Sequence, residues 1–119
     1  MASNSSPEVN AITIRTRDLM LALSNEPLGV AGILVGKGFI SGEIMSKMLI
    51  VSYTSTEKAI ILIEAVRNKI ELAPSKFTEL LEILSEVACA KDVVESLCST
   101  YQSELTSLIY DQSSSHVHT

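Results

Sequence analysis

The chain has few basic residues, few cysteines and no long apolar run. Its 119 residues include nine lysines and arginines against fourteen aspartates and glutamates, which gives a net charge of −5 at pH 7. We therefore expect no nucleic-acid binding, because that function relies on an excess of positive charge. Two cysteines are too few for a disulfide framework and are typical of reduced thiols in the cytoplasm.

Membrane and secretory segments are not predicted either. The mean hydropathy is positive, at +0.30, yet unbroken apolar stretches are short, such as 48–51 and 59–63. A spanning helix needs about 18 apolar residues. The first residues do not combine a basic segment with an apolar one, so no signal peptide is predicted. We expect a cytoplasmic protein without membrane partners.

What the chain does contain is a high proportion of apolar residues, 46%, which excludes disorder of the whole chain. Its length fits one domain that buries roughly two-thirds of its unfolded surface. The polar ends, residues 1–8 and 112–119, are predicted to be disordered, and residues 9–111 to form the domain.

Apolar residues recur at helical spacing throughout that domain, which predicts an all-α bundle of six helices. The clearest apolar stripe predicts a central helix and consists of Ala59, Leu62, Ile63, Val66 and Ile70. The first half of segment 9–25 is rich in β-branched residues, so an irregular start is expected. The predicted helices cover approximately 9–25, 28–36, Ser41 to the break at Tyr53, 55–70, 74–87 and 91–109.

Residues that begin and end helices support this division. Ser41 is a candidate N-cap, and Thr54 with Glu57 has the spacing of a capping box. Pro74 suits a first helical turn. Gly32 and Gly36, four residues apart, predict the close approach of another helix.

Catalytic and metal-binding chemistry is not predicted. Cys98 lies on an apolar stripe with Leu97 and Tyr101, where a buried thiol is normally inert. His116 and His118 lie in the polar tail, too weakly held to serve as a base or as a metal site. We expect no enzyme, no metal and no cofactor.

Surface chemistry offers better candidates. An acidic stripe runs along segment 74–87, although a solvated helix face is the default interpretation of such a stripe. Segments three and four carry apolar residues on more than one face, including Leu49, Ile50, Val51 and Ile60. Either these side chains are buried all round, or some of them form an exposed patch that a partner covers.

The order of these motifs is similar to that of a known family. The run 34–44 resembles the passage between the second and third helices of caspase-recruitment domains. Residues 55–66 look like the fourth helix of that family, and residues 70–84 like the fifth. The resemblance extends over roughly residues 9–108. It implies a death fold, in which six antiparallel helices form a Greek-key bundle whose first helix is often irregular.

The resemblance also implies a function, namely non-catalytic, homotypic association with like domains, as an adaptor or regulator in apoptotic or innate-immune signalling. By position, the basic face would consist of Arg15, Arg17, Lys58, Arg67 and Lys69. The acidic face, which would meet the basic face of a partner, would consist of Glu26, Glu43, Glu79, Glu82 and Glu86. The family's usual acidic side, on helices two and three, is thin in this chain, and the acidic excess lies on helices five and six.

Two alternatives stay open. Another death-fold subfamily, a death or death-effector domain, would act by the same mechanism on other partners. A helical bundle that binds a small apolar ligand would need a large enclosed apolar cavity, whereas a tightly filled core would count against it.

Overall fold

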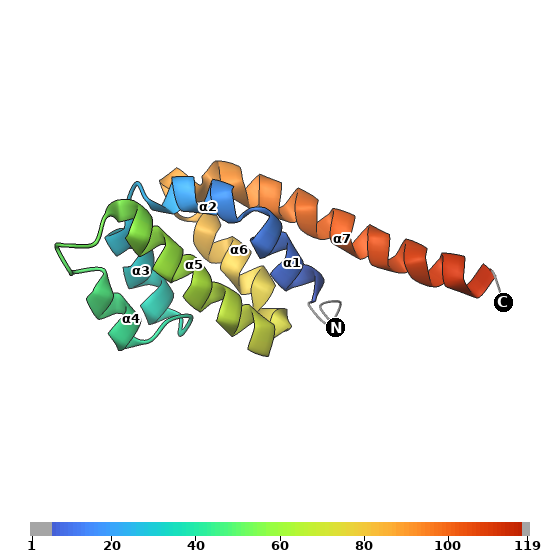
Figure 1. Ribbon diagram of the computed structural model, residues 1–119, viewed down its shortest axis with the longest axis horizontal. Helices are drawn as coiled ribbons and strands as arrows, with labels where there is room; N and C mark the ends of the chain where they lie inside the picture. The colour runs from blue at the N-terminus through green and yellow to red at the C-terminus, as the bar shows by residue number, and fades with distance from the viewer. Residues whose placement is uncertain (1–5, 118–119) are drawn as a thin grey trace.

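Seven α-helices make up the fold in the computed structural model, which describes residues 6–117 and the side chains of residues 6–109 (Figure 1). No strand occurs within residues 6–117, so the all-α prediction is confirmed. The helices are α1 (Pro7–Ile14), α2 (Thr16–Leu23), α3 (Pro27–Gly36), α4 (Gly42–Lys47), α5 (Ser55–Leu72), α6 (Phe77–Ser85) and α7 (Lys91–Val117), with 3₁₀ turns η2 (Pro74–Lys76) and η3 (Ala88–Ala90).

The first predicted helix is broken at Arg15 into α1 and α2. The hydroxyls of Thr13 and Thr16 donate to the carbonyls of Val9 and Ile12, each at 2.9 Å. Such bonds to the carbonyl four residues back bend helices, and β-branched residues crowd the same stretch. The irregular start expected from the sequence is therefore a break between two short helices.

Helix α1 begins two residues before the start expected from the sequence. The Ser6 side chain accepts a hydrogen bond from the Val9 amide at 3.2 Å, and Pro7 occupies the first turn, so α1 begins at Pro7 rather than at residue 9. Residues 1–5, which the sequence predicted to be disordered, lie outside the described residues.

The other predicted helix caps are confirmed. The Ser41 hydroxyl accepts from the Ile44 amide at 3.3 Å. Both bonds of the capping box are present, because Thr54 Oγ1 accepts from the Glu57 amide at 3.0 Å and Glu57 Oε1 accepts from the Thr54 amide at 2.7 Å. Gly38 has a φ of +79°, which a residue with a side chain rarely adopts.

Helix α5 lies at the centre of the bundle and contacts α1, α2, α3 and α4. Its five predicted core residues, Ala59 to Ile70, are all buried. Gly32 and Gly36, by contrast, are exposed on α3, and no described atom beyond the neighbouring residues and the backbone of α3 itself lies within 4 Å of a Cβ placed on either. The close helix approach predicted at these glycines is therefore wrong.

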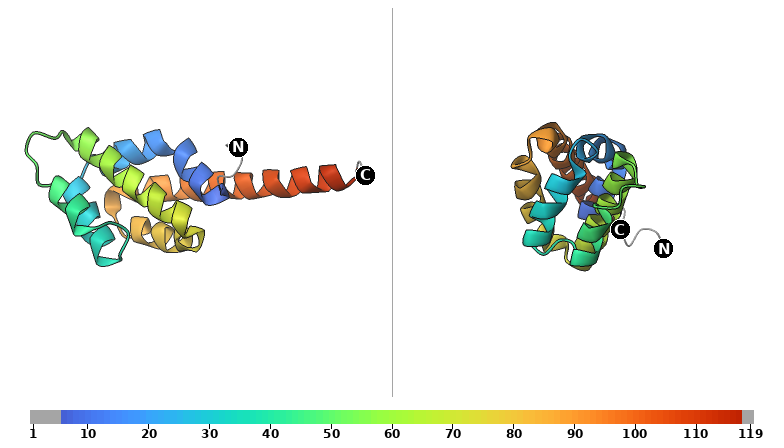
Figure 2. Two further views of the ribbon diagram at one scale, coloured as in Figure 1. Left: turned by 60° about the horizontal axis from the view of Figure 1, so that its bottom comes forward. Right: turned by 90° about the vertical axis from the view of Figure 1, so that its left-hand side faces the viewer.

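Helix α7 is longer than the sequence predicted. Its backbone is helical to Val117, although the domain was expected to end at residue 111. Its first half packs against α1 and α6, whereas its second half extends beyond the other helices (Figures 1 and 2). Leu108, predicted to face the core, is exposed, because no helix covers α7 at that point. Residues 118–119 of the predicted tail lie outside the described part.

Within the described part of the chain, no single helix has the length and apolar content to cross a membrane. Helices α2 and α3 meet that requirement only when taken together, and the angle between them is 106°.

Candidate interaction surfaces

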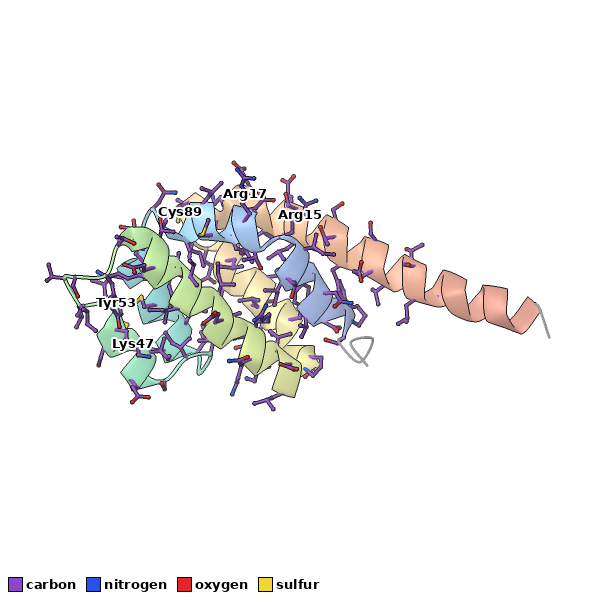
Figure 3. All side chains as sticks on the ribbon, in the orientation of Figure 1. Arg15, Arg17, Lys47, Tyr53 and Cys89 are labelled. Carbon is purple, nitrogen blue, oxygen red and sulfur yellow. The ribbon has the colours of Figure 1, made fainter. Side chains whose placement is uncertain are left out.

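Arg15, assigned to the basic face by the resemblance, is held within the fold. Its Nε donates to Thr100 Oγ1 at 2.7 Å, and its Nη1 pairs with Asp18 Oδ2 at 3.2 Å. Thr100 on α7 is only 7% exposed, so Arg15 satisfies a hydroxyl that solvent scarcely reaches. Figure 3 shows the arginine where α1, α2 and α7 meet. Arg15 therefore joins elements of the bundle, and charge on a free surface is not its main contribution.

Two more polar contacts join α1 to α7. Asn10 Nδ2 donates to Glu104 Oε1 at 3.1 Å, and the Tyr101 hydroxyl donates to Glu8 Oε2 at 3.0 Å. The Tyr101 ring also packs against Phe77 of α6, with the ring centroids 4.8 Å apart. Burial raises the pKa of the Tyr101 hydroxyl, and the hydrogen bond to Glu8 and the negative charge of Glu8 act in the same direction. We call these contacts, with Arg15–Thr100, the α1–α7 seam.

Arg17 is the predicted basic residue that is free to meet a partner. It is exposed on α2 and points away from the bundle (Figure 3). Among the described side chains it takes part in no ion pair. Leu21, one turn further along α2, is 58% exposed, and Ile14 just before the helix is also exposed. Arg17 therefore lies close in the chain to two apolar side chains that are exposed to water.

The remaining basic residues do not share one face of α5. Lys58 and Lys69 are eleven residues apart, about three helical turns, and lie on the same flank of the helix. Arg67 lies two and a half turns from Lys58 and therefore on the opposite flank. All three side chains are half-buried. The structure does not bring the predicted basic residues onto one surface.

The predicted acidic residues fall in two separate places. Glu79 and Glu82 lie on the outer side of α6, opposite its buried residues, and Glu86 follows the last residue of the helix. Glu79 pairs with Lys76 at 3.5 Å. Glu26 and Glu43 are exposed at the starts of α3 and α4. The α6 stripe is the denser group of negative charge.

The predicted burial of Cys98 is wrong, because this thiol is exposed. The buried side of α7 carries Val93, Leu97 and Thr100, so Cys98, one residue after Leu97, is turned away by about 100°. Cys89 is half-buried. The side chains of His116 and His118 lie outside the described part. Among the described residues, no group of three potential metal ligands is present.

The core is nearly filled. An apolar cavity of about 10 Å³ lies between Ile12, Leu34, Ile63 and Leu84, among others. That volume is about the space of one water molecule, whereas pockets for organic ligands measure roughly 300–1,000 Å³. The enclosed apolar cavity that a ligand-binding bundle would need is not found in this core.

The apolar surplus noted in the sequence forms an exposed patch at one end of the bundle. Leu49 and Val51, in the loop between α4 and α5, are 63% and 95% exposed, and Ile50 and Ile60 are also exposed. This loop lies at the opposite end of the molecule from the C-terminal half of α7 (Figures 1 and 2). We call Leu49, Ile50, Val51 and Ile60 the loop patch.

A shallow groove beside the loop patch is lined by Tyr53, Glu57, Ile60 and Ile61. This groove was not predicted from the sequence. The excess of apolar residues at 49–51 and 60–61 was the available signal, but helical periodicity does not show which of several apolar faces remains open.

Comparisons with protein-family models, with curated proteins and with solved structures found no match to this chain.

Proposed function

We propose that the chain is a non-catalytic protein–protein interaction module of the caspase-recruitment type. It associates with like domains in the cytoplasm as an adaptor or regulator, in apoptotic or innate-immune signalling. The observation that carries the proposal is the exposed side of α2, where Arg17 stands free beside Leu21.

The order of the helices supports this proposal. When α1 and α2 are counted as one broken helix, six helices follow one another, as the resemblance to caspase-recruitment domains implies. The break at Arg15 corresponds to the irregular first helix expected of that family. The short α4, which follows the Ser41 cap, also has the position in the chain of the third helix that the resemblance implies.

The chemistry of the α2 surface supports it as well. Residues that dominate binding energy at protein interfaces are often arginines surrounded by apolar groups that exclude water. Arg17 with Leu21 and Ile14 has this composition. A surface with closely spaced carboxylates, such as the α6 stripe of another copy, would complement the arginine.

The test is light scattering and negative-stain microscopy of the purified chain over a range of protein concentrations at low and high salt. We expect assemblies that grow with concentration and shrink as salt screens the charged contacts. Arg17→Glu should weaken assembly, whereas Lys91→Glu, an equal charge change at an exposed residue of α7, should not. Arg15 is unsuitable for this test because it bonds Thr100.

Two results would contradict the proposal. Assemblies that tolerate Arg17→Glu as well as Lys91→Glu would show that the α2 surface is not the interface. A monomer at every concentration and at both salt levels would exclude self-association, and a like domain from another protein would then have to bind in an Arg17-dependent way for the proposal to stand.

A further inference from the structure

The loop patch is an exposed apolar surface that the bundle does not need for its own core. Val51 is 95% exposed and Leu49 63%, although buried apolar residues fill the core elsewhere. Exposed apolar residues gathered in one place mark an interaction site more often than single ones do.

The loop between α4 and α5 holds these side chains in a fixed position. Met48, immediately before Leu49, is buried and anchors one end of the loop. The capping box of Thr54 and Glu57 anchors the other end. Backbone bonds from the Leu49, Ile50 and Tyr53 amides to carbonyls three residues back close successive turns between the two ends. The apolar tip is therefore preorganised, so little conformational entropy is lost when it is covered.

The tip of the loop, Leu49 to Val51, projects from the end of the bundle (Figure 1), and a groove lies beside it. The groove lined by Tyr53, Glu57, Ile60 and Ile61 begins two residues after Val51. Two other surface hollows are chemically different: one along α7 is lined by serine, threonine and glutamine, and one between α2 and α7 includes two aspartates. The groove beside the tip offers isoleucine and tyrosine side chains, which suit an apolar tip.

The charged residue nearest to the tip in the chain and the charged residue that lines the groove have opposite signs. Lys47 is two residues before Leu49 and so lies on the tip side, and Figure 3 shows both Lys47 and Tyr53 at this end of the molecule. Glu43 lies one helical turn further from the tip. The groove side carries Glu57 and, one turn after Ile60 on the same side of α5, exposed Glu64. A surface with Lys47 beside its tip therefore fits the acidic rim of this groove.

We propose that the loop patch is the interface of a two-fold dimer, in which the tip of each chain enters the groove of a second copy. Because the tip and the groove lie side by side, a two-fold axis between them lets the tip of each chain enter the groove of the other chain at the same time. Lys47 of each chain then approaches Glu57 and Glu64 of the other, which an acidic membrane surface would not offer. The loop patch shares no residue with the exposed side of α2, and this dimer does not rest on the proposed function.

Sedimentation equilibrium of the full chain at increasing concentration tests this dimer. The patch is small, so we expect a weak, reversible dimer that persists at high salt, because apolar contacts are not screened. Val51→Asp should raise the dimer dissociation constant by about tenfold or more, since it places a charge in the partner's groove. Leu72→Asp is the matched control, because Leu72 is also exposed, at 86%, but lies at the far end of α5.

Thermal unfolding at low protein concentration shows whether each variant folds, and the unfolding temperature of the Val51→Asp chain should equal that of the wild type. Three results would overturn the proposal: a wild-type monomer at every concentration, equal loss of the dimer in Leu72→Asp, or loss in Arg17→Glu rather than in Val51→Asp. Val51-dependent binding to phosphatidylcholine–phosphatidylserine vesicles by a monomeric chain would also overturn it and assign the patch to a membrane. Salt-sensitive assembly that depends on Arg17 but not on Val51 would leave the proposed function intact while this inference fails.

Discussion

The two ends of the bundle use side chains in opposite ways. At the α1–α7 seam, polar groups are partly withdrawn from water and make hydrogen bonds, such as Arg15 to Thr100 and Tyr101 to Glu8. At the loop patch, apolar groups are left in water, although burying them would favour folding. Specific polar contacts therefore close the fold at one end, whereas the exposed apolar residues at the other end are available for association.

The largest effect on stability should come from the core between these ends. Leu62→Ala removes a fully buried side chain of α5 and should lower the free energy of unfolding by about 2–5 kcal/mol. Val51→Ala at the loop patch should change it by less than about 0.5 kcal/mol. Urea unfolding followed by circular dichroism compares the two. Equal losses would show that the loop patch is packed in solution.

At the seam, Arg15→Ala should cost about 1–3 kcal/mol, because it leaves the poorly exposed Thr100 hydroxyl without its partner. Arg17→Ala, two residues away and exposed, is the control and should be nearly neutral. The same unfolding measurement checks both variants. If the two variants lower the free energy of unfolding equally little, Arg15 acts as a surface residue, as the sequence indicated.

At the start of α5, Thr54→Ala removes the helix cap next to the loop patch. The expected cost is about 1 kcal/mol, with Ser52→Ala in the same loop as a control that removes no cap bond. Amide hydrogen exchange should quicken first in the opening turn of α5. Unchanged exchange there would mean that the loop is not anchored by its cap.

The smallest effect concerns pH at the seam. Because the pKa of Tyr101 is raised in the folded chain, the neutral hydroxyl contributes stability that is fully present below about pH 10 and is lost as the pH rises through the folded-state pKa. Above about pH 10, the free energy of unfolding should therefore fall less steeply with rising pH in Tyr101→Phe than in the wild type. Parallel curves for the two proteins would show that neither burial nor the Glu8 contact raises the pKa of Tyr101 in the folded chain.

Features of the fold could be predicted from the sequence where the interacting residues lie close together in the chain. The α5 stripe and the Thr54–Glu57 capping box were predicted because each depends on residues within one helix or one turn. The role of Arg15 was not, because its partner Thr100 lies 85 positions away. No local pattern distinguishes an arginine that bonds across the bundle from one that faces solvent, such as Arg17.

Helix boundaries and orientations show the same limit. The sequence indicated an irregular start between residues 9 and 25, but the location of the break at Arg15 depends on threonine hydroxyls that bond their own helix. The exposure of Cys98 was missed because the apolar stripe of α7 is wide, and only its neighbours decide which edge is buried. Candidate surfaces were found as residue types, while their grouping in space required the fold.

The pairing of α1 with α7 has a consequence for how the chain is made. Thr100 leaves the ribosome 85 residues after Arg15. The delay is on the order of 4–17 s at typical synthesis rates of roughly 5–20 residues per second. Throughout that interval α1 lacks α7, one of the two helices that it chiefly packs against. Although α1 precedes the other six described helices, its packing is thus among the last to be completed, and the bundle can complete its fold only after the first half of α7 has emerged.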